Sequence, residues 1–174
     1  MQDETKYDYR ADPVLAEALA YWQSKRAGRS MPARRDIDPI EIPKLLPHIE
    51  LVQIMPDGRS RYRVVGTTLV NAFGRDYTRN YADELFDGPR GETIVAQHRT
   101  VCIAAQPIFT RSRYLTEKRT DLIANRLSLP LSDNDLDVNM ILAVLTLQYG
   151  YAPIAGEWGA AHFTAADVEI VPPL

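Results

Sequence analysis

Residues 61 to 76 constrain the fold of this chain more than any other stretch. Tyr62 and Val64 alternate with arginines, which is the period of a half-buried strand. Apolar residues then recur at helical spacing as far as Phe73. Gly74 stands where a helix needs a left-handed residue in order to turn away. A strand that leads into short helices, followed later in the chain by a longer helix and three strands, is the layout of a small sensory domain, and it favours ligand or partner binding over catalysis.

Composition narrows the class of protein further. The chain has 174 residues, of which 45% are hydrophobic, and this is enough for one domain with extensions and a proper core. The net charge of −3 lacks the overall excess of positive charge that is typical of nucleic-acid-binding proteins. Cys102 is the only cysteine, which excludes an internal disulfide framework and fits a reducing cytoplasm. The longest apolar run, residues 140–147, is too short to span a membrane, and the polar start of the chain lacks the pattern of a secretory signal.

An amphipathic helix is expected near the N-terminus. Asp12 followed by Pro13 is an N-cap with proline at the first helical position. Leu15, Leu19 and Trp22 then form one apolar stripe. Such a stripe needs an apolar surface, which either the same chain or a second copy could supply. We expect these three side chains to form the contact with a partner, most simply in a homodimer.

A basic stretch follows this helix. Five lysine and arginine residues fall between residues 25 and 35. One interpretation is a solvated linker, and the other is a contact site for an acidic partner or a nucleotide. We take residues 1–35 as the N-terminal helix with this linker, 36–149 as the main domain, and 150–174 as an extension that packs on the domain or is partly disordered.

Five strands and one long helix are expected in the main domain. The helix covers residues 91–105, because apolar residues recur there on one arc and Pro107 stops it. The last strand does not alternate, so both of its faces should be covered. The strands are expected over residues 49–55, 61–66, 108–115, 122–131 and 138–149.

Several separated motifs give the chain a family resemblance. They are Trp22, Lys25–Arg29, Met31–Arg34, Asp36–Pro39, Leu45–Pro47, Tyr62–Thr67 and Phe73–Asp76. On these motifs, over residues 12–149, the chain resembles a bacterial family of stand-alone PAS-like proteins. The resemblance implies an α+β PAS fold: a five-stranded antiparallel sheet with helices on one face, here preceded by the amphipathic helix. It also implies a pocket that senses a small molecule, a cofactor or a redox state, and a change that is passed to a protein partner.

His98 is the leading candidate for ligand contact, because it lies mid-arc on the apolar face of the long helix. Haem-binding PAS members take an axial histidine from the corresponding helix, so the resemblance leaves haem open as a cofactor, which is otherwise unknown. The alternative is a histidine that lines an organic-ligand pocket or bonds a buried group. The expected pocket residues are His98, Cys102, Ile94, Asn125, Leu127 and Met140, with Phe73 near the mouth.

Asn125 and Cys102 can also be explained by structural functions that involve no ligand. Asn125 shares one face of its strand with aliphatic residues, so its amide needs a backbone group, a water or a ligand as partner. Cys102 on the helix is by default a small buried residue, and a redox role would need exposure and a lowered pKa. Residues 71–75 contain no cysteine, so the covalent flavin adduct of photoactive PAS members is not expected.

Catalysis has little support from the sequence. The chain has no nucleophile elbow, no zinc-protease motif and no phosphate-binding glycine loop ending in Lys-Ser or Lys-Thr. We therefore expect a cytoplasmic PAS-type sensory or regulatory module that binds a small, mostly apolar ligand and signals through protein–protein contact. The alternatives are a ligand-free interaction or dimerisation domain, and a haem sensor that uses His98.

Overall fold

The computed structural model describes residues 7–85, 88–115, 121–150 and 164–171. The helices and strands are α1 (Pro13–Lys25), the short 3-10 turns η1 (Arg34–Asp36), η2 (Pro39–Glu41) and η3 (Leu46–His48), β1 (Ile49–Ile54), β2 (Ser60–Val65), α2 (Thr67–Phe73), α3 (Ala82–Leu85), α4 (Gly88–Ala104), β3 (Ile108–Leu115), β4 (Asp121–Leu131), β5 (Met140–Gly150) and β6 (Thr164–Ile170). No helix in this described part is both long and apolar enough to cross a membrane.

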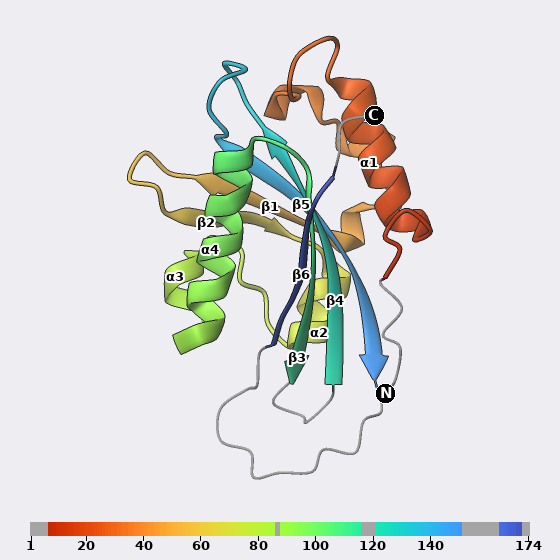
Figure 1. Cartoon of the computed structure of the whole chain (residues 1–174), viewed down its shortest axis with the longest axis vertical. Coiled ribbons are helices and arrows are strands. Elements are labelled where there is room, and N and C mark those ends of the chain that lie inside the picture. The colour runs from red at the N-terminus through yellow and green to blue at the C-terminus, as the bar shows by residue number, and fades with distance from the viewer. Residues whose placement is uncertain (1–6, 86–87, 116–120, 151–163, 172–174) are drawn as a thin grey trace.

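The strands form one antiparallel sheet in the order β2-β1-β5-β4-β3-β6. The five predicted strands are all present, and each begins and ends within two residues of its predicted limits. The sixth strand was not predicted. β6 comes from the C-terminal extension and pairs with β3, so this part of the extension is an edge strand of the sheet (Figure 1). Residues 151–163 and 172–174 lie outside the described residues.

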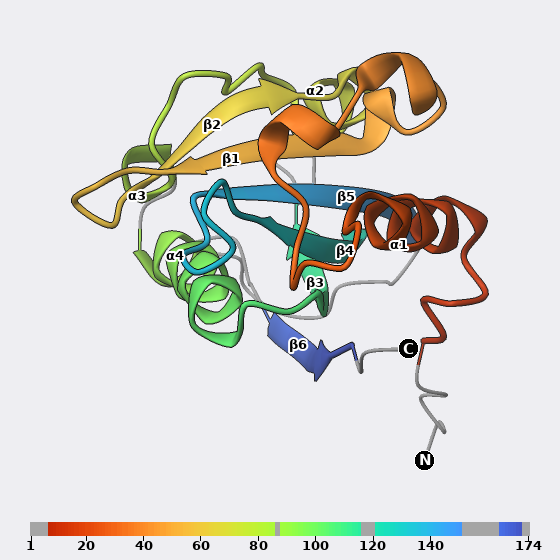
Figure 2. The ribbon, with the colours of Figure 1, turned by 90° about the horizontal axis from the view of Figure 1, so that it is seen from above.

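The register of the strands sorts the side chains into two faces. Glu50, Ala143 and Ser128 are successive cross-strand partners and therefore share one face. Leu51 and Leu142 are partners on the other face. Helices α4 and α1 lie on opposite sides of the sheet (Figures 1 and 2). We call the side toward α4 the helical face and the side toward α1 the outer face.

Helix α1 begins as expected. The Asp12 side chain accepts hydrogen bonds from the backbone N–H groups of Val14 and Leu15, with N···O distances of 3.0 and 3.3 Å. Pro13 occupies the first turn, where the missing N–H costs nothing. The cap therefore fixes the start of the helix and leaves its apolar stripe turned toward the sheet.

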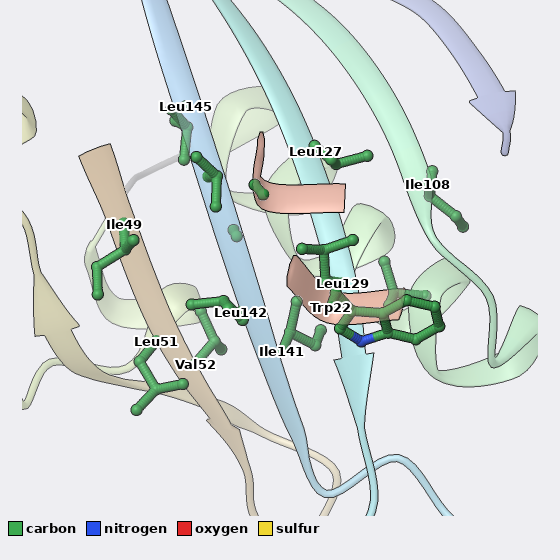
Figure 3. Packing of buried hydrophobic residues seen from close by; sticks show 14 of the residues in the cluster. Trp22, Ile49, Leu51, Val52, Ile108, Leu127, Leu129, Ile141, Leu142 and Leu145 are labelled. Carbon is green, nitrogen blue, oxygen red and sulfur yellow. The ribbon is translucent and has the colours of Figure 1, made fainter. Parts of the chain in front are cut away.

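The outer face of the sheet is covered by this same helix. Leu15, Leu19 and Trp22 are buried, and the Trp22 indole Nε1–H donates to the carbonyl oxygen of Pro130 in β4 at 2.8 Å. Figure 3 shows the Trp22 ring beside β4, close to Leu129. The expectation that the stripe contacts a partner was therefore wrong, because the chain's own sheet already buries these side chains.

The basic stretch and the turns after it pack on the domain. We call residues 34–48 the connecting segment. Lys25 pairs with Glu41, and Arg29 pairs with Asp36. The Tyr21 hydroxyl donates to Glu41 and accepts the backbone N–H of Asp38. The connecting segment is therefore tied to α1 and to the turn after it by side-chain contacts.

Two glycines determine the backbone geometry of residues 61–76. Gly74 has a φ of 77° and ends α2 in the left-handed conformation, as predicted. Gly66 lies between β2 and α2, where its N–H donates to the carbonyl oxygen of Ile49 at 2.8 Å. A Cβ atom on Gly66 would collide with the backbone oxygens of Pro47 and Leu46. Close approach of two backbone segments, rather than φ, requires glycine at this position.

Substitution of Gly66 by alanine should therefore destabilise the fold. The new methyl group would push η3 away from the start of α2, and overpacking of this kind costs about 1–3 kcal/mol. Chemical denaturation of the Gly66→Ala variant measures the change in the free energy of unfolding. Thr67→Ala, at the exposed neighbouring position, is the matched control and should change stability by less than about 0.5 kcal/mol. Equal stability of Gly66→Ala and the parent chain would contradict the close approach.

Candidate functional site

A buried ion pair lies on the helical face of the sheet. Arg126 in β4 donates from Nη1 to Oε2 of Glu50 in β1 at 2.7 Å, and the two residues are 4% and 1% exposed. Strand β5 lies between β1 and β4. The cross-strand partner of Glu50 on β5 is Ala143, whose small side chain leaves room for the arginine to reach across. The pair therefore links two strands that are not neighbours.

Two tyrosines surround this pair. The Tyr77 hydroxyl donates to Oε1 of Glu50 at 2.5 Å, so both carboxylate oxygens of Glu50 are hydrogen-bonded. Burial, with the negative charge of Glu50, raises the pKa of Tyr77 and keeps the phenol protonated. Tyr62 in β2 meets Tyr77 edge to face, with ring centroids 4.9 Å apart. The carboxylate is thus enclosed by groups that either pair with it or exclude water.

His98 in α4 completes the wall on the side of the helix. It is 1% exposed, and its ring centroid lies 6.0 Å from that of Tyr62. Neither ring nitrogen has a hydrogen-bond partner among the described residues. Burial, helped by the nearby positive charge of Arg126, lowers the pKa of His98 to about 3. The imidazole is therefore neutral at physiological pH and offers one donor and one acceptor.

Thr110 in β3 adds a second polar side chain without a partner. It is the cross-strand partner of Arg126, so it lies on the same face and directly beside it. Its hydroxyl is buried and has no hydrogen-bond partner in the described part of the chain. We call Glu50, Tyr77, His98, Thr110 and Arg126 the polar cluster. The charges of Glu50 and Arg126 cancel. The ring nitrogens of His98 and the hydroxyl of Thr110, which have no partner among the described residues, can donate and accept hydrogen bonds.

The surroundings of His98 do not fit a haem. An axial histidine needs open space over its nitrogen for the macrocycle, but the buried Tyr62 ring packs against the imidazole. The ion pair of Glu50 and Arg126 fills the helical face of the sheet nearby, and a porphyrin would have to break it. Among the described residues, no three His, Cys, Asp or Glu side chains are grouped to hold a metal ion.

The structure separates the residues predicted to line one pocket. Ile94 and His98 are buried on α4, and the Phe73 ring lies 6.4 Å from that of Tyr77, at the margin of the polar cluster. Cys102 is half-buried, and burial raises the pKa of its thiol, which fits the simpler reading of a packed, unreactive residue.

The other three predicted residues lie on the outer face. Leu127 pairs with Val144, and Met140 pairs with Leu131 and Gln53, in the register of that face. The Asn125 amide donates to the Thr146 hydroxyl at 3.5 Å, and this hydroxyl donates to Asp12. The predicted pocket set was therefore wrong for Asn125, Leu127 and Met140. The apolar face of β4 packs under α1, and its polar face turns toward α4.

Sequence reasoning missed four residues of the polar cluster: Glu50, Tyr77, Thr110 and Arg126. A signal was present for Glu50, because a charged residue in a mostly apolar strand needs a buried partner. Only the order of the strands shows that Arg126, which is 76 residues away, is that partner.

Removal of one charge from this pair should destabilise the protein strongly. In Arg126→Met, Glu50 stays buried without its cation, and such a loss costs about 3–5 kcal/mol. Adding Glu50→Gln to this variant removes the uncompensated charge and should restore part of that loss. A double-mutant cycle from urea unfolding measures the coupling between the two residues. Additive effects of the two substitutions would contradict a buried, coupled pair.

Stability below pH 6.5 should depend on His98. Its folded pKa of about 3 lies below the ordinary value of 6.5, so only the unfolded chain takes up the proton between these limits. As pH falls through this window, His98 lowers stability by about 1.4 kcal/mol per pH unit. His98→Gln removes this proton uptake. Urea unfolding at pH 7 and pH 5 should show a smaller pH-dependent loss in the variant than in the parent, and parallel losses would disprove the buried neutral state.

Comparison with known proteins agrees with this architecture. A family model described as PAS domain matches residues 10–146, which is most of the chain and includes α1, the connecting segment and the strands β1 to β4. No curated protein matches the chain. The antiparallel sheet with α4 over one face is the α+β arrangement that the motifs indicated, and the preceding helix α1 covers the other face. The chain belongs to the PAS domain family.

Proposed function

We propose that this PAS domain is a sensory module that binds a small, uncharged molecule at the polar cluster and passes the change to a protein partner. Family membership supports a sensory or regulatory role in the coarse sense. The observation that carries the finer proposal is His98, a fully buried histidine whose two ring nitrogens have no partner among the described residues. Buried polar atoms are rarely left unpaired in proteins, so such a group calls for a partner.

The charges of the site define the chemistry of that ligand. Glu50 and Arg126 neutralise one another, and His98 is neutral because its pKa is about 3. A charged ligand would bring an uncompensated charge into a buried site, which is costly. A neutral molecule with a donor and an acceptor, such as an amide or an alcohol, can bond His98 and Thr110 without this cost.

This ligand is more polar than the one expected from the sequence. Two of the apolar residues expected in the pocket, Leu127 and Met140, lie on the other face of the sheet. Ile94 and Val101 on α4 are buried and still supply apolar surface beside His98. A small apolar body with one hydrogen-bonding group therefore suits the described side chains best.

Helix α4 is the proposed route by which the signal leaves. It carries His98 on its buried side, and on its outer side Ile103 is a large apolar residue that is 76% exposed. A ligand that bonds His98 would shift or stabilise α4, and a partner that contacts the helix would sense that shift. In this proposal the polar cluster binds the ligand, and α4 transmits the resulting change to the protein partner. The proposal involves no catalytic step.

Ligand binding is tested on the freshly purified full chain by native mass spectrometry, followed by ligand-observed NMR with a set of uncharged amides and alcohols. We expect either a bound mass or at least one bound probe, and a loss of affinity of tenfold or more in His98→Leu. Thr100→Ala, on the exposed side of α4, is the matched control and should bind as the parent does.

Two results would overturn the proposal. One is a parent chain with no bound mass and no binding of any neutral probe. The other is equal binding by His98→Leu and the parent, because the ligand would then lie elsewhere. An absorbance spectrum on the same sample gives an independent check on haem. A Soret band that is present in the parent and lost in His98→Leu would show that the polar cluster rearranges to admit a haem at His98.

A further inference from the structure

A cavity lies on the outer face of the sheet, away from the polar cluster. Its volume is about 420 Å³, within the range of about 300–1,000 Å³ that small-molecule sites occupy. The connecting segment forms one wall, and β1, β2 and β5 form the other. Leu51 on β1 pairs with Val64 and with Leu142, so these three cavity residues share the outer face. In Figure 2 the orange connecting segment lies beside β1 and α1.

The walls of this cavity are mainly apolar. Ile37, Ile42 and Leu46 line it from the connecting segment, and Leu51, Val64 and Leu142 line it from the sheet. Val64 is 40% exposed on the edge strand β2, which is unusual for a large apolar side chain. An apolar ligand body would cover surface that the fold itself leaves partly open to water.

The cavity is held open by fixed structure. Pro39, Pro43 and Pro47 stiffen the connecting segment where it lines the site. The Asp38 side chain accepts the backbone N–H of Ile40, which fixes the turn η2. The ties to α1 described above fix this segment in place. A preformed cavity binds a ligand without a large ordering cost.

Among the described residues that line the cavity, Arg34 is the one that carries a charge. Its Nη1 donates to the carbonyl oxygen of Ile37 at 2.9 Å, and it forms no ion pair in the described part of the chain. The acidic side chains of this region are otherwise engaged: Asp36 with Arg29, Glu41 with Lys25, and Asp38 in its turn. The guanidinium is therefore the one positive group in an apolar wall, with N–H groups left to donate.

We propose that this cavity binds an amphipathic monocarboxylate, with its carboxylate on Arg34 and its apolar body between the connecting segment and the sheet. The carboxylate supplies the negative charge that the wall lacks, and a planar guanidinium matches its geometry. The aliphatic side chains take up a saturated or aromatic body of medium length. This site is independent of the polar cluster, because Leu51 and Glu50 are successive residues of β1 and point to opposite faces.

The test uses octanoate and 1-octanol as probes on the full chain at pH 7.4, with isothermal titration calorimetry. The two probes share an apolar body, and only octanoate carries a charge. We expect octanoate to bind at least tenfold more tightly than octanol, because hydrogen bonds between two charged groups are stronger than those to a neutral hydroxyl. Arg34→Gln should reduce octanoate affinity to that of octanol and leave octanol binding unchanged. Arg35→Gln, the exposed neighbour, is the matched control and should not change either affinity.

A second variant tests the apolar part of the cavity. Val64→Trp places a large ring on a half-exposed position of the edge strand, where folding should tolerate it, and it should abolish binding of both probes. Absence of octanoate binding to the parent would overturn the proposal, and so would equal losses in Arg34→Gln and Arg35→Gln. His98→Leu should bind octanoate normally. A loss there would assign octanoate to the helical face, so failure of this proposal is distinguishable from failure of the proposed function.

Discussion

The arrangement of this domain depends on the ion pair between Glu50 and Arg126. It joins β1 to β4 across an intervening strand, over the small side chain of Ala143. Both charges are removed from water, so the fold must keep them together or lose several kcal/mol. This requirement fixes which side of β4 turns toward α4, and it places Tyr77 and His98 where they enclose the pair. A buried pair of this kind specifies one arrangement of the strands more than it raises total stability.

The alternation of strand β1 separates two chemically different environments. Glu50 and Val52 belong to the polar, helix-covered side, while Ile49 and Leu51 belong to the side that α1 and the connecting segment cover. A displacement of β1 by a ligand on one side therefore moves residues on the other side as well. The two proposed sites are chemically independent but share this strand, which gives a physical path for coupling between them without any contact between their ligands.

The local pattern of residue types was enough to predict the helices and strands. It was not enough to predict which face of each strand is covered by which helix. The Asp12 cap, the left-handed Gly74 and the limits of five strands follow from residue type and spacing, which act over a few residues. The placement of Asn125 and Leu127 failed because alternation shows that two faces differ and does not show which helix covers each one. The partners of Glu50 lie 27 and 76 residues away, so only the assembled sheet reveals them. The burial of His98 was predictable because a polar residue on an apolar helical arc is visible in the sequence alone.

Strand β6 changes how the sheet ends. An open edge presents unpaired N–H and C=O groups and invites another strand to add to it. The C-terminal extension occupies the β3 edge from within the chain, and the opposite edge strand, β2, carries Arg61 and Arg63, whose charges oppose addition of a further strand. Extension of the sheet from one molecule into the next is thus opposed by charge at the β2 edge, whereas at the other end the open edge is moved from β3 to β6. A strand that added to this end of the sheet would pair with the C-terminal extension, so the extension decides whether the sheet can grow there.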